Sequence, residues 1–212
     1  MRKPSDLGFD DSTHVLPELI VNHHAVKNEE NLVVNGQIQL FNQIARRLPE
    51  VRVEQQQTIK SRCEMAVSLV TDNDPCVYWC NFNKEAELLR ELDKDAVEVS
   101  GSMSIDKKEA VLLDFAEGNI SRLITKPKIT AFGLNWQHCN HTIYFPTFSY
   151  EQYYQSIRRF WRFGQTRPVT VDLVYSDGQK RVMDSLLAKT DKANELFDKL
   201  NSAINSNYMA TV

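Results

Sequence analysis

The sequence has no long apolar run, few glycines and prolines, and no paired cysteine motif. Its 212 residues include seven glycines and seven prolines, too few for a collagen-like or low-complexity chain. No stretch of about 18 apolar residues is present to span a bilayer, and the first residues carry no apolar signal core. The four cysteines contain no CxxC pair. We therefore expect a cytoplasmic protein with free thiols and no membrane partner.

The composition is that of a globular protein with a segregated charge. Hydrophobic residues make up 42% of the chain, enough to bury a core, and the net charge is −3. Residues 122–167 contain seven basic residues and one acidic residue, so this window carries +6 and the remainder carries −9. The same window holds eleven of the twenty aromatic residues. We expect the functional chemistry to lie there.

The first third of the chain differs from the rest in its pattern of polar and apolar residues. Residues 1–31 are polar and show no sustained period, so we interpret residues 1–35 as a linker or extended lead-in. Residues 36–75 are predicted to be a helical segment. Its first helix has apolar residues at helical spacing up to Leu48 and is stopped by Pro49, and its second helix spans residues 54–70.

From Cys76 onward, short apolar runs alternate with amphipathic stretches. Strands are predicted at residues 76–80, 96–99, 122–125, 142–145 and 169–174, and helices at residues 84–92, 105–116, 150–163 and 179–204. This alternation predicts an α/β fold in which a mainly parallel sheet lies between two layers of helices. Ligands of such sheets bind beyond the carboxyl ends of the strands. The loops at Asn81 and at residues 100–102, 126–135 and 146–149 should therefore share one edge.

One predicted helix presents two arginines. Ser149 and Gln152 have the spacing of a capping box, which places the start of the helix at Tyr150. At helical spacing, Gln155, Arg159 and Arg162 share one face, opposite an apolar face. Two guanidinium groups on a rigid helix suit a polyanion such as a triphosphate. The alternative is an ordinary solvated surface.

Several segments in this region resemble helicase motifs. The run from Gln155 to Gln165, QSIRRFWRFGQ, resembles the sixth motif of superfamily-two helicases in the form found in Swi/Snf-like DNA translocases. The run from Thr125 to Asn135, TKPKITAFGLN, looks like the fifth motif. Residues 77–81 and 99–102 resemble the fourth motif and the strand and turn that follow it. The amino-acid sequence of these motifs is most similar to that of phage-encoded DNA helicases.

The resemblance implies that residues 76–212 form the second RecA-like lobe of a two-lobed motor. In that interpretation Arg162 is the arginine finger and Arg159 its companion, a pair that would offset charge during phosphoryl transfer. The remaining implied sites are nucleotide-binding Gln155, Gln165, Gly133 and Asn135, and DNA-backbone-binding Thr125, Lys126, Lys128, Asn81 and Ser102. An ordinary surface turn is the alternative for the two lysines.

The parts of the first lobe are missing from the sequence. No GxxxxGK[ST] loop is present, nor an Asp-Glu pair after an apolar run to hold magnesium. The resemblance therefore implies that ATP with Mg²⁺ is bound mainly by a first RecA-like lobe, in cis or as a separate chain, and that this chain alone is inactive. Residues 1–31 would be the tail of the connection between lobes. The alternative is a stand-alone, non-catalytic module that binds DNA or docks a partner. A self-contained nucleotide-binding enzyme is disfavoured.

Three further groups of residues are interpreted as structural and not as functional sites. His23 and His24, and the trio of His138, Cys139 and His141, lack the second half of a zinc site, so we predict no metal. Cys76 and Cys80 fall on the same face of a strand and are expected in the core. Trp136 is interpreted as a core residue, with base or adenine stacking as the alternative.

Overall fold

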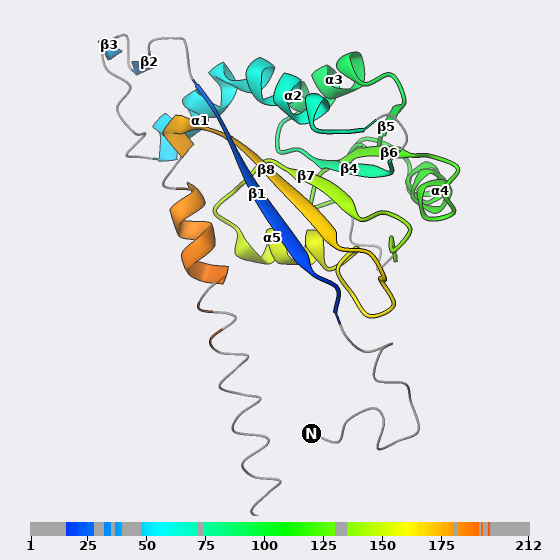
Figure 1. Ribbon diagram of the computed structural model, residues 1–212. Coiled ribbons are helices and arrows are strands. Elements are labelled where there is room, and N and C mark those ends of the chain that lie inside the picture. Colours follow the sequence, from blue (N-terminus) through cyan, green and yellow to red (C-terminus); the bar gives the residue numbers. More distant parts are fainter. Residues whose placement is uncertain are drawn as a thin grey trace, which may run out of the picture.

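The protein is built on a six-stranded sheet in which every strand is parallel to its neighbours. The computed structural model describes residues 16–27, 32–34, 37–39, 48–71, 74–129, 135–179, 182–190, 192 and 195. The strand order is β1-β8-β7-β4-β6-β5 (Figure 1). These strands are β1 (Leu19–Val26), β4 (Cys76–Trp79), β5 (Ala96–Glu98), β6 (Arg122–Thr125), β7 (His141–Tyr144) and β8 (Val169–Ser176).

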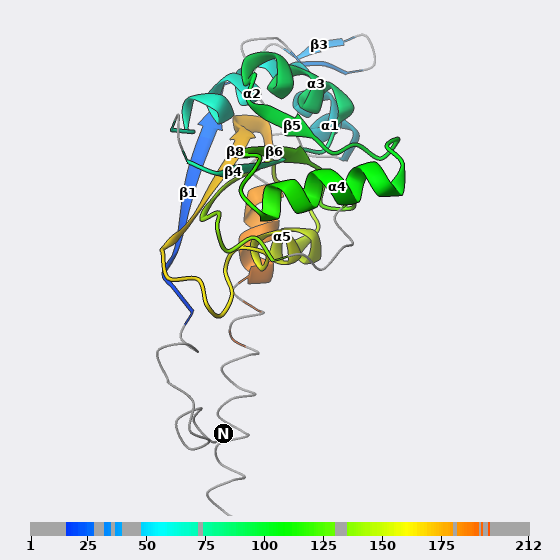
Figure 2. The ribbon, with the colours of Figure 1, turned by 90° about the vertical axis from the view of Figure 1, so that its right-hand side faces the viewer.

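Helices cover both faces of this sheet. They are α1 (Leu48–Gln57), α2 (Ile59–Ser68), α3 (Asn83–Leu92), α4 (Ile105–Ala116) and α5 (Tyr150–Ile157), followed by a 3-10 turn (Asp177–Gln179) and helical residues 182–190. In Figure 1, α2 and α3 lie above the sheet and α5 below it, and Figure 2 shows α4 running along the side near β5 and β6. The predicted three-layer α/β fold is confirmed.

Each face of the sheet has its own apolar core. Val77 and Trp79 of β4 point to the core shared with α4 and α5, whereas Cys76 and Tyr78 point to the core shared with α2 and α3. Every residue of β4 is buried, as expected for a strand covered on both faces. All four cysteines are buried free thiols, which confirms that prediction.

We interpret residues 1–35 from the sequence as a linker or extended lead-in, but Leu19–Val26 form strand β1 of the sheet. Its eight residues pair with β8 from Leu19 opposite Val169 to Val26 opposite Ser176. The indole Nε1 of Trp161 also donates to the carbonyl of Pro17, over 2.7 Å. Most side chains of β1 stay partly exposed because it lies at the edge of the sheet, so its sequence is too polar to show a buried strand.

The helical prediction for the residues before Pro49 is wrong at residues 37–39. Residues Gln37–Gln39 form β3, antiparallel to β2 (Leu32–Val34), and residues 40–47 lie outside the described part. Helix α1 begins at Leu48, with Pro49 in its first turn. Proline is tolerated there because the first backbone N–H groups of a helix have no partner within it. Pro49 therefore starts a helix instead of ending one.

Helix α5 is shorter than predicted and ends before both candidate arginines. Its last residue is Ile157, and residues 158–163 continue in tight turns. The amide of Phe160 bonds to the carbonyl of Ile157 over 3.0 Å, and the Phe160 ring is fully buried against Trp79 and Trp136. Burial of this ring accompanies the departure from the helix. The expectation that Arg159 and Arg162 share a helix face is therefore wrong.

The segment after β8 is interrupted by the 3-10 turn, and its helix is described over residues 182–190. Most of the predicted helix beyond residue 190 lies outside the described residues. In the described part of the chain no helix has the length and apolar character needed to cross a membrane.

Candidate functional site

A groove of about 400 Å³ opens beside the carboxyl ends of three sheet strands. The loops that follow β4, β6 and β7 form it, together with the first turn of α5. Its lining includes Asn81, Lys126 and Lys128 among the predicted nucleic-acid residues, and also Thr147, Ser149 and Gln152. The expected meeting of loops at one edge is confirmed for Asn81 and for residues 126–128 and 147–149, whereas residues 100–102 do not line the groove. The groove thus combines two ammonium groups with amide and hydroxyl donors.

Asn81 is held at the mouth of this groove from two sides. Its side-chain nitrogen donates to the carbonyl of Phe145 over 3.0 Å, and its backbone N–H donates to Oε2 of Glu85 over 2.7 Å. Lys126 bonds through its ammonium group to Oδ1 of Asn83. Asn81 and Lys126 also line a second hollow of about 310 Å³ on the side of α1 and α2. Both residues therefore sit between two adjoining grooves.

Two predicted nucleic-acid residues do not line the groove. Thr125 is buried, and its hydroxyl donates to the carbonyl of Val99 over 3.3 Å, which ties the end of β6 to the end of β5. Ser102 is exposed in the turn before α4, where its hydroxyl lies 3.0 Å from that of Ser100. Thr125 therefore supports the loop that carries Lys126, and Ser102 lies apart from the groove.

Arg159 and Arg162 lie close enough to interact electrostatically. Burial lowers the pKa of Arg159, and the positive charge of Arg162 lowers this pKa further. The guanidinium of Arg159 lies over the ring of Trp136, 5.3 Å from its centroid, and its carbonyl accepts the Trp136 N–H over 3.1 Å. The chain thus brings together two like charges, an arrangement that suits an anion.

The other predicted nucleotide-binding residues are not brought together in the way that the two arginines are. Gln165 is buried and donates to the carbonyls of Gln137 and Cys139, so its amide joins the segment before β7 to the turn after Arg162. Gln155 is exposed and donates to Glu151 on its own helix, and Asn135 is exposed and donates to Gln137. Gly133 lies outside the described residues.

A polar cluster that sequence reasoning missed lies across three strands. The carboxylate of Asp172 on β8 is bonded by Asn22 and His24 of β1 and by His141 of β7, over 2.9, 2.8 and 2.6 Å. Burial raises the pKa of Asp172, but the three side-chain hydrogen bonds, that of His141 first, outweigh it and bring this pKa to about 2. Nothing in the spacing of these residues indicates the cluster, because it depends on β1 pairing with β8.

The described residues contain no group of three or more histidine, cysteine and carboxylate side chains that could hold a metal ion. His24 and His141 each hydrogen-bond to one carboxylate oxygen of Asp172. Trp136 is fully buried and stacks on Trp79 with ring centroids 5.9 Å apart, so its assignment to the core is confirmed.

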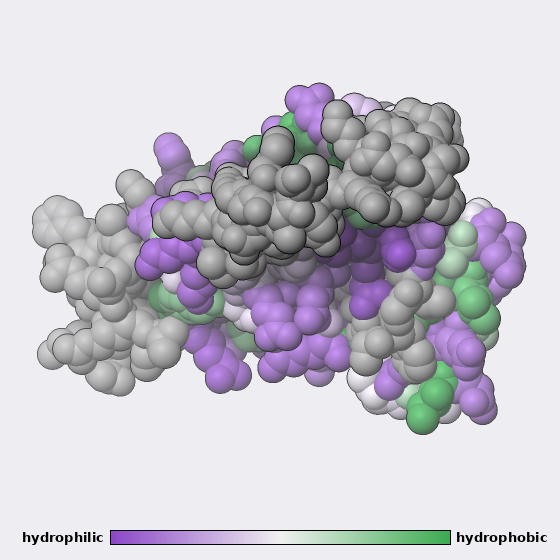
Figure 3. Space-filling model, turned by 90° about the horizontal axis from the view of Figure 1, so that it is seen from below, coloured by the Kyte–Doolittle hydropathy of each residue, from purple (hydrophilic) through white to green (hydrophobic). Residues whose placement is uncertain are grey.

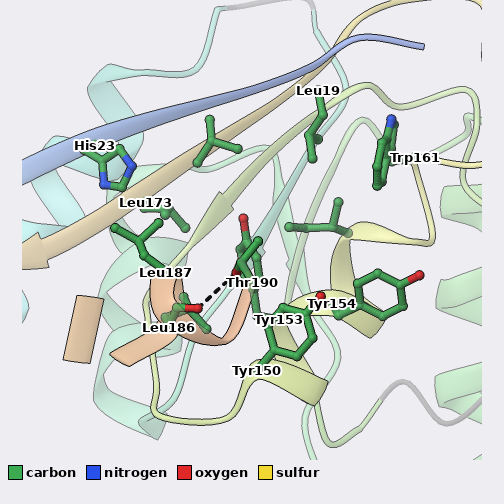
Figure 4. A pocket seen from close by; sticks show the side chains of 12 residues that line it. Leu19, His23, Tyr150, Tyr153, Tyr154, Trp161, Leu173, Leu186, Leu187 and Thr190 are labelled. Atoms are coloured by element: carbon green, nitrogen blue, oxygen red, sulfur yellow. Dashed lines mark hydrogen bonds between the residues drawn. The ribbon is translucent and has the colours of Figure 1, made fainter. Parts of the chain in front are cut away.

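An apolar pocket of about 170 Å³ lies between β1, α5 and residues 182–190. Tyr150, Tyr153, Tyr154 and Trp161 contribute aromatic rings to it. In the view of Figure 4, His23 and Trp161 lie on opposite sides of the pocket, and the hydroxyl of Thr190 donates to the carbonyl of Leu186. The apolar face predicted for α5 therefore packs against the edge strand and the last described helix. None of the predicted site residues lines this pocket.

The conserved C-terminal domain model of helicases matches residues 58–164, just over half of the chain. The match contains the groove-lining residues and both arginines. The chain belongs to the helicase C-terminal domain family. No curated protein matches the sequence.

Solved structures support the fold of this helicase C-terminal domain. The C-terminal part of the Fun30 ATPase domain aligns with a TM-score of 0.52 at 17% identity, over 61% of this chain and 45% of that one. Dbp5 of S. cerevisiae, bound to RNA and ADP BeF3, aligns with a TM-score of 0.54 at 14% identity, over 84% and 41%. The C-terminal domain of the DEAD-box protein Dbp5 aligns with a TM-score of 0.50 at 14% identity, over 82% of this chain and 85% of that one. This chain spans less than half the length of the first two proteins.

One face of this helicase C-terminal domain can be followed in the space-filling view. On the face seen in Figure 3, hydrophilic residues dominate the described surface and apolar side chains show only in small patches. The large exposed apolar residues of the described chain come from six separate places in the sequence, namely Ile20, Leu92, Ile105, Leu113, Phe163 and Leu187.

Proposed function

We propose that this domain is the C-terminal lobe of an ATP-dependent DNA helicase or translocase, and that it supplies an arginine finger and part of the DNA track. The observation that carries the proposal is the electrostatic interaction of Arg159 with Arg162, together with the place of Arg159 over the ring of Trp136, which follows the fifth-motif run. That run begins at Thr125, next to the groove. One stretch of chain therefore connects the two proposed sites.

Arg162 is the proposed arginine finger and Arg159 its companion. A first RecA-like lobe, in cis or as a separate chain, would hold ATP with Mg²⁺, whose γ-phosphoryl group is the one transferred. A fixed guanidinium offsets the charge that develops on this group and contributes about 10³ to 10⁵ in rate. The proximity of Arg159 to Arg162 fits a polyanion, because two guanidinium groups repel each other and an anion that contacts both relieves the repulsion.

The proposed DNA track is the groove of Asn81, Lys126 and Lys128. These side chains offer two charges and an amide to backbone phosphates, and such contacts set register without reading bases. Thr125 would support Lys126 from below through its bond to Val99, and Ser102 would be a peripheral contact on the same edge. The acidic remainder of the chain would discourage unproductive contact elsewhere.

The other motif residues have supporting roles in this proposal. Gln165 would align the arginines through the backbone carbonyls that it holds, and Gln155 and Asn135 are exposed and open to phosphate oxygens. Gly133 would allow close approach of the backbone to the nucleotide. The amino-acid sequences of the fifth and sixth motifs support a Swi/Snf-like enzyme related to phage-encoded helicases. Such an enzyme would act in the cytoplasm of a bacterium or of a phage-infected host.

Steady-state ATP hydrolysis tests the proposal. It should be measured for this chain alone and for the two-lobed assembly, with single-stranded DNA, duplex DNA and RNA. We expect turnover only in the two-lobed assembly, and only with DNA. DNA binding without turnover in either form would favour a non-catalytic DNA-binding or docking module. Tight ATP binding by this chain alone would favour a self-contained nucleotide-binding enzyme, and stimulation by RNA alone would overturn the choice of DNA.

A further inference from the structure

A buried ion pair connects α2 to the loop that forms a wall of both grooves. Nη1 of Arg62 on α2 lies 2.7 Å from Oε1 of Glu85 on α3, and both side chains are almost completely buried, with exposed fractions of 1% and 0%. The other carboxylate oxygen of Glu85 accepts the backbone N–H groups of Asn81 and Phe82, over 2.7 and 2.9 Å. Arg62 therefore acts on this loop through one carboxylate.

A second route joins Arg62 to the same loop. Its guanidinium lies over the ring of Phe145, 5.0 Å from the centroid, and the carbonyl of Phe145 accepts the side-chain N–H of Asn81. The two routes form a closed circuit in which Asn81 is fixed through both its backbone and its side chain.

Arg62 is itself held rigidly within the α1–α2 segment. Its Nη2 donates to the carbonyl of Gln55 over 2.5 Å, and its Nε donates to the hydroxyl of Thr58 over 3.2 Å. Thr58 in turn donates to the carbonyl of Glu54 over 2.7 Å. Arg62 cannot touch a phosphate, because its side chain is buried. Its donors are directed to the junction between the two helices and to Glu85.

We propose that Arg62 is a positioning residue for the nucleic-acid track, which fixes Asn81 in the groove through Glu85 and Phe145. This inference rests on the proposed function and assigns a role to the α1–α2 segment: it braces the wall on which Asn81 and the neighbouring Asn83, the partner of Lys126, are placed. Burying two charges costs solvation energy that an apolar pair would avoid. The two buried charges lie where the backbone donors of Asn81 and Phe82 and the partly buried amide of Asn81 need a fixed geometry.

The test compares variants of the full chain in two measurements. Arg62→Met leaves Glu85 buried without its partner and can fail to fold, so the main variant is Arg62→Met combined with Glu85→Gln. The glutamine keeps an acceptor oxygen but loses the charge. Tyr78→Phe is the matched control, since it removes a buried hydrogen bond to Asp93 beyond the far end of α3. The probes are labelled oligo(dT) and a labelled duplex, with titrations well below the melting temperature of each variant.

We expect the double variant to fold and to bind DNA about tenfold more weakly, which corresponds to about 1.4 kcal/mol. The slope of log Kd against log salt should not change, because the lysines that neutralise phosphates are untouched. The single variant Arg62→Lys should bind DNA more tightly than the double variant but more weakly than the wild type. Tyr78→Phe should bind like the wild type. Unchanged affinity in the folded double variant, or an equal weakening in Tyr78→Phe, would overturn the positioning role.

Hydrogen exchange at the amides of Asn81 and Phe82 separates this inference from the proposed function. Both amides donate to Glu85, so they should exchange faster in the double variant than in the wild type and in Tyr78→Phe. If the wild type binds no DNA, the proposed function fails whatever the exchange rates are. If the wild type binds DNA and these amides keep their protection in the double variant, the positioning role fails alone.

Discussion

Trp136 and Arg159 are joined twice, once through backbone and once through side chain. The Trp136 N–H donates to the carbonyl of Arg159 over 3.1 Å, and the guanidinium of Arg159 lies over the Trp136 ring, 5.3 Å from its centroid. The residue that follows the fifth-motif run thus holds the sixth-motif arginine. A cation over an indole is held by the ring electrons as well as by packing.

Replacing Trp136 should loosen Arg159 as well as the core. Trp136→Ala removes a fully buried indole and should lower the free energy of unfolding by about 3 to 5 kcal/mol. Trp136→Phe keeps a ring and should cost less. Urea unfolding followed by circular dichroism gives both values. A cost below about 1 kcal/mol for Trp136→Ala would contradict the packing described for this indole.

Lys126 and Lys128 should contribute to the salt dependence of DNA binding. Each phosphate that is no longer neutralised should reduce the slope of log Kd against log salt by about 1, so the double alanine variant should show a slope lower by about 2. The control is Lys94→Ala, an exposed lysine just beyond the end of α3 that is remote from the groove. Fluorescence titrations at several salt concentrations measure the slopes. Equal slopes in the wild type and the double variant would remove these lysines from the track.

Asp172 should stabilise the sheet only while it is ionised. Its pKa is lowered from 3.8 to about 2, so the ionised form contributes about 2 kcal/mol above about pH 4, and this contribution is lost as the pH falls toward 2. Asp172→Asn should therefore be less stable than the wild type at pH 6, with the difference shrinking in acid. Urea unfolding from pH 6 to pH 3 checks this. A constant difference across that range would contradict the role of the charge.

The edge strand β1 should be required for a stable domain. A chain that begins at residue 36 would expose the edge of β8 and lose the packing of Leu19 and Val21 on the core. We expect it to aggregate or to melt at a much lower temperature than a chain that begins at residue 16, which keeps β1. Equal melting temperatures for the chains that begin at residues 36 and 16 would show that β1 is dispensable.

The inner strands and the meeting of the loops are predictable from sequence because local patterns determine them. The buried parallel strand β4 is a short apolar run, and the rule that ligands bind beyond the carboxyl ends of such strands predicts that Asn81 lies near Lys126. The length of α5 is not predictable in this way, since the chain leaves the helix just before Phe160, whose ring packs against the stacked rings of Trp79 and Trp136. Such packing depends on residues distant in sequence.

The same reason explains the interactions that sequence analysis missed. Asp172 meets His24 only because β1 joins the sheet beside β8, and Arg62 meets Glu85 only after α2 packs on α3. Thr125 carries the motif but turns its hydroxyl to Val99. A motif thus locates a loop, and the side-chain partners within it follow from the fold.

The most direct test of the account is the effect of Arg162→Ala on DNA-stimulated ATP hydrolysis by the two-lobed assembly. Arg162→Lys tests whether a planar guanidinium is needed, and Arg90→Ala on the exposed face of α3 is the control. We predict that turnover falls about 10³-fold or more in Arg162→Ala while ATP binding is retained, and that Arg90→Ala keeps full turnover. Unchanged turnover in Arg162→Ala would contradict the assignment of this residue as the arginine finger.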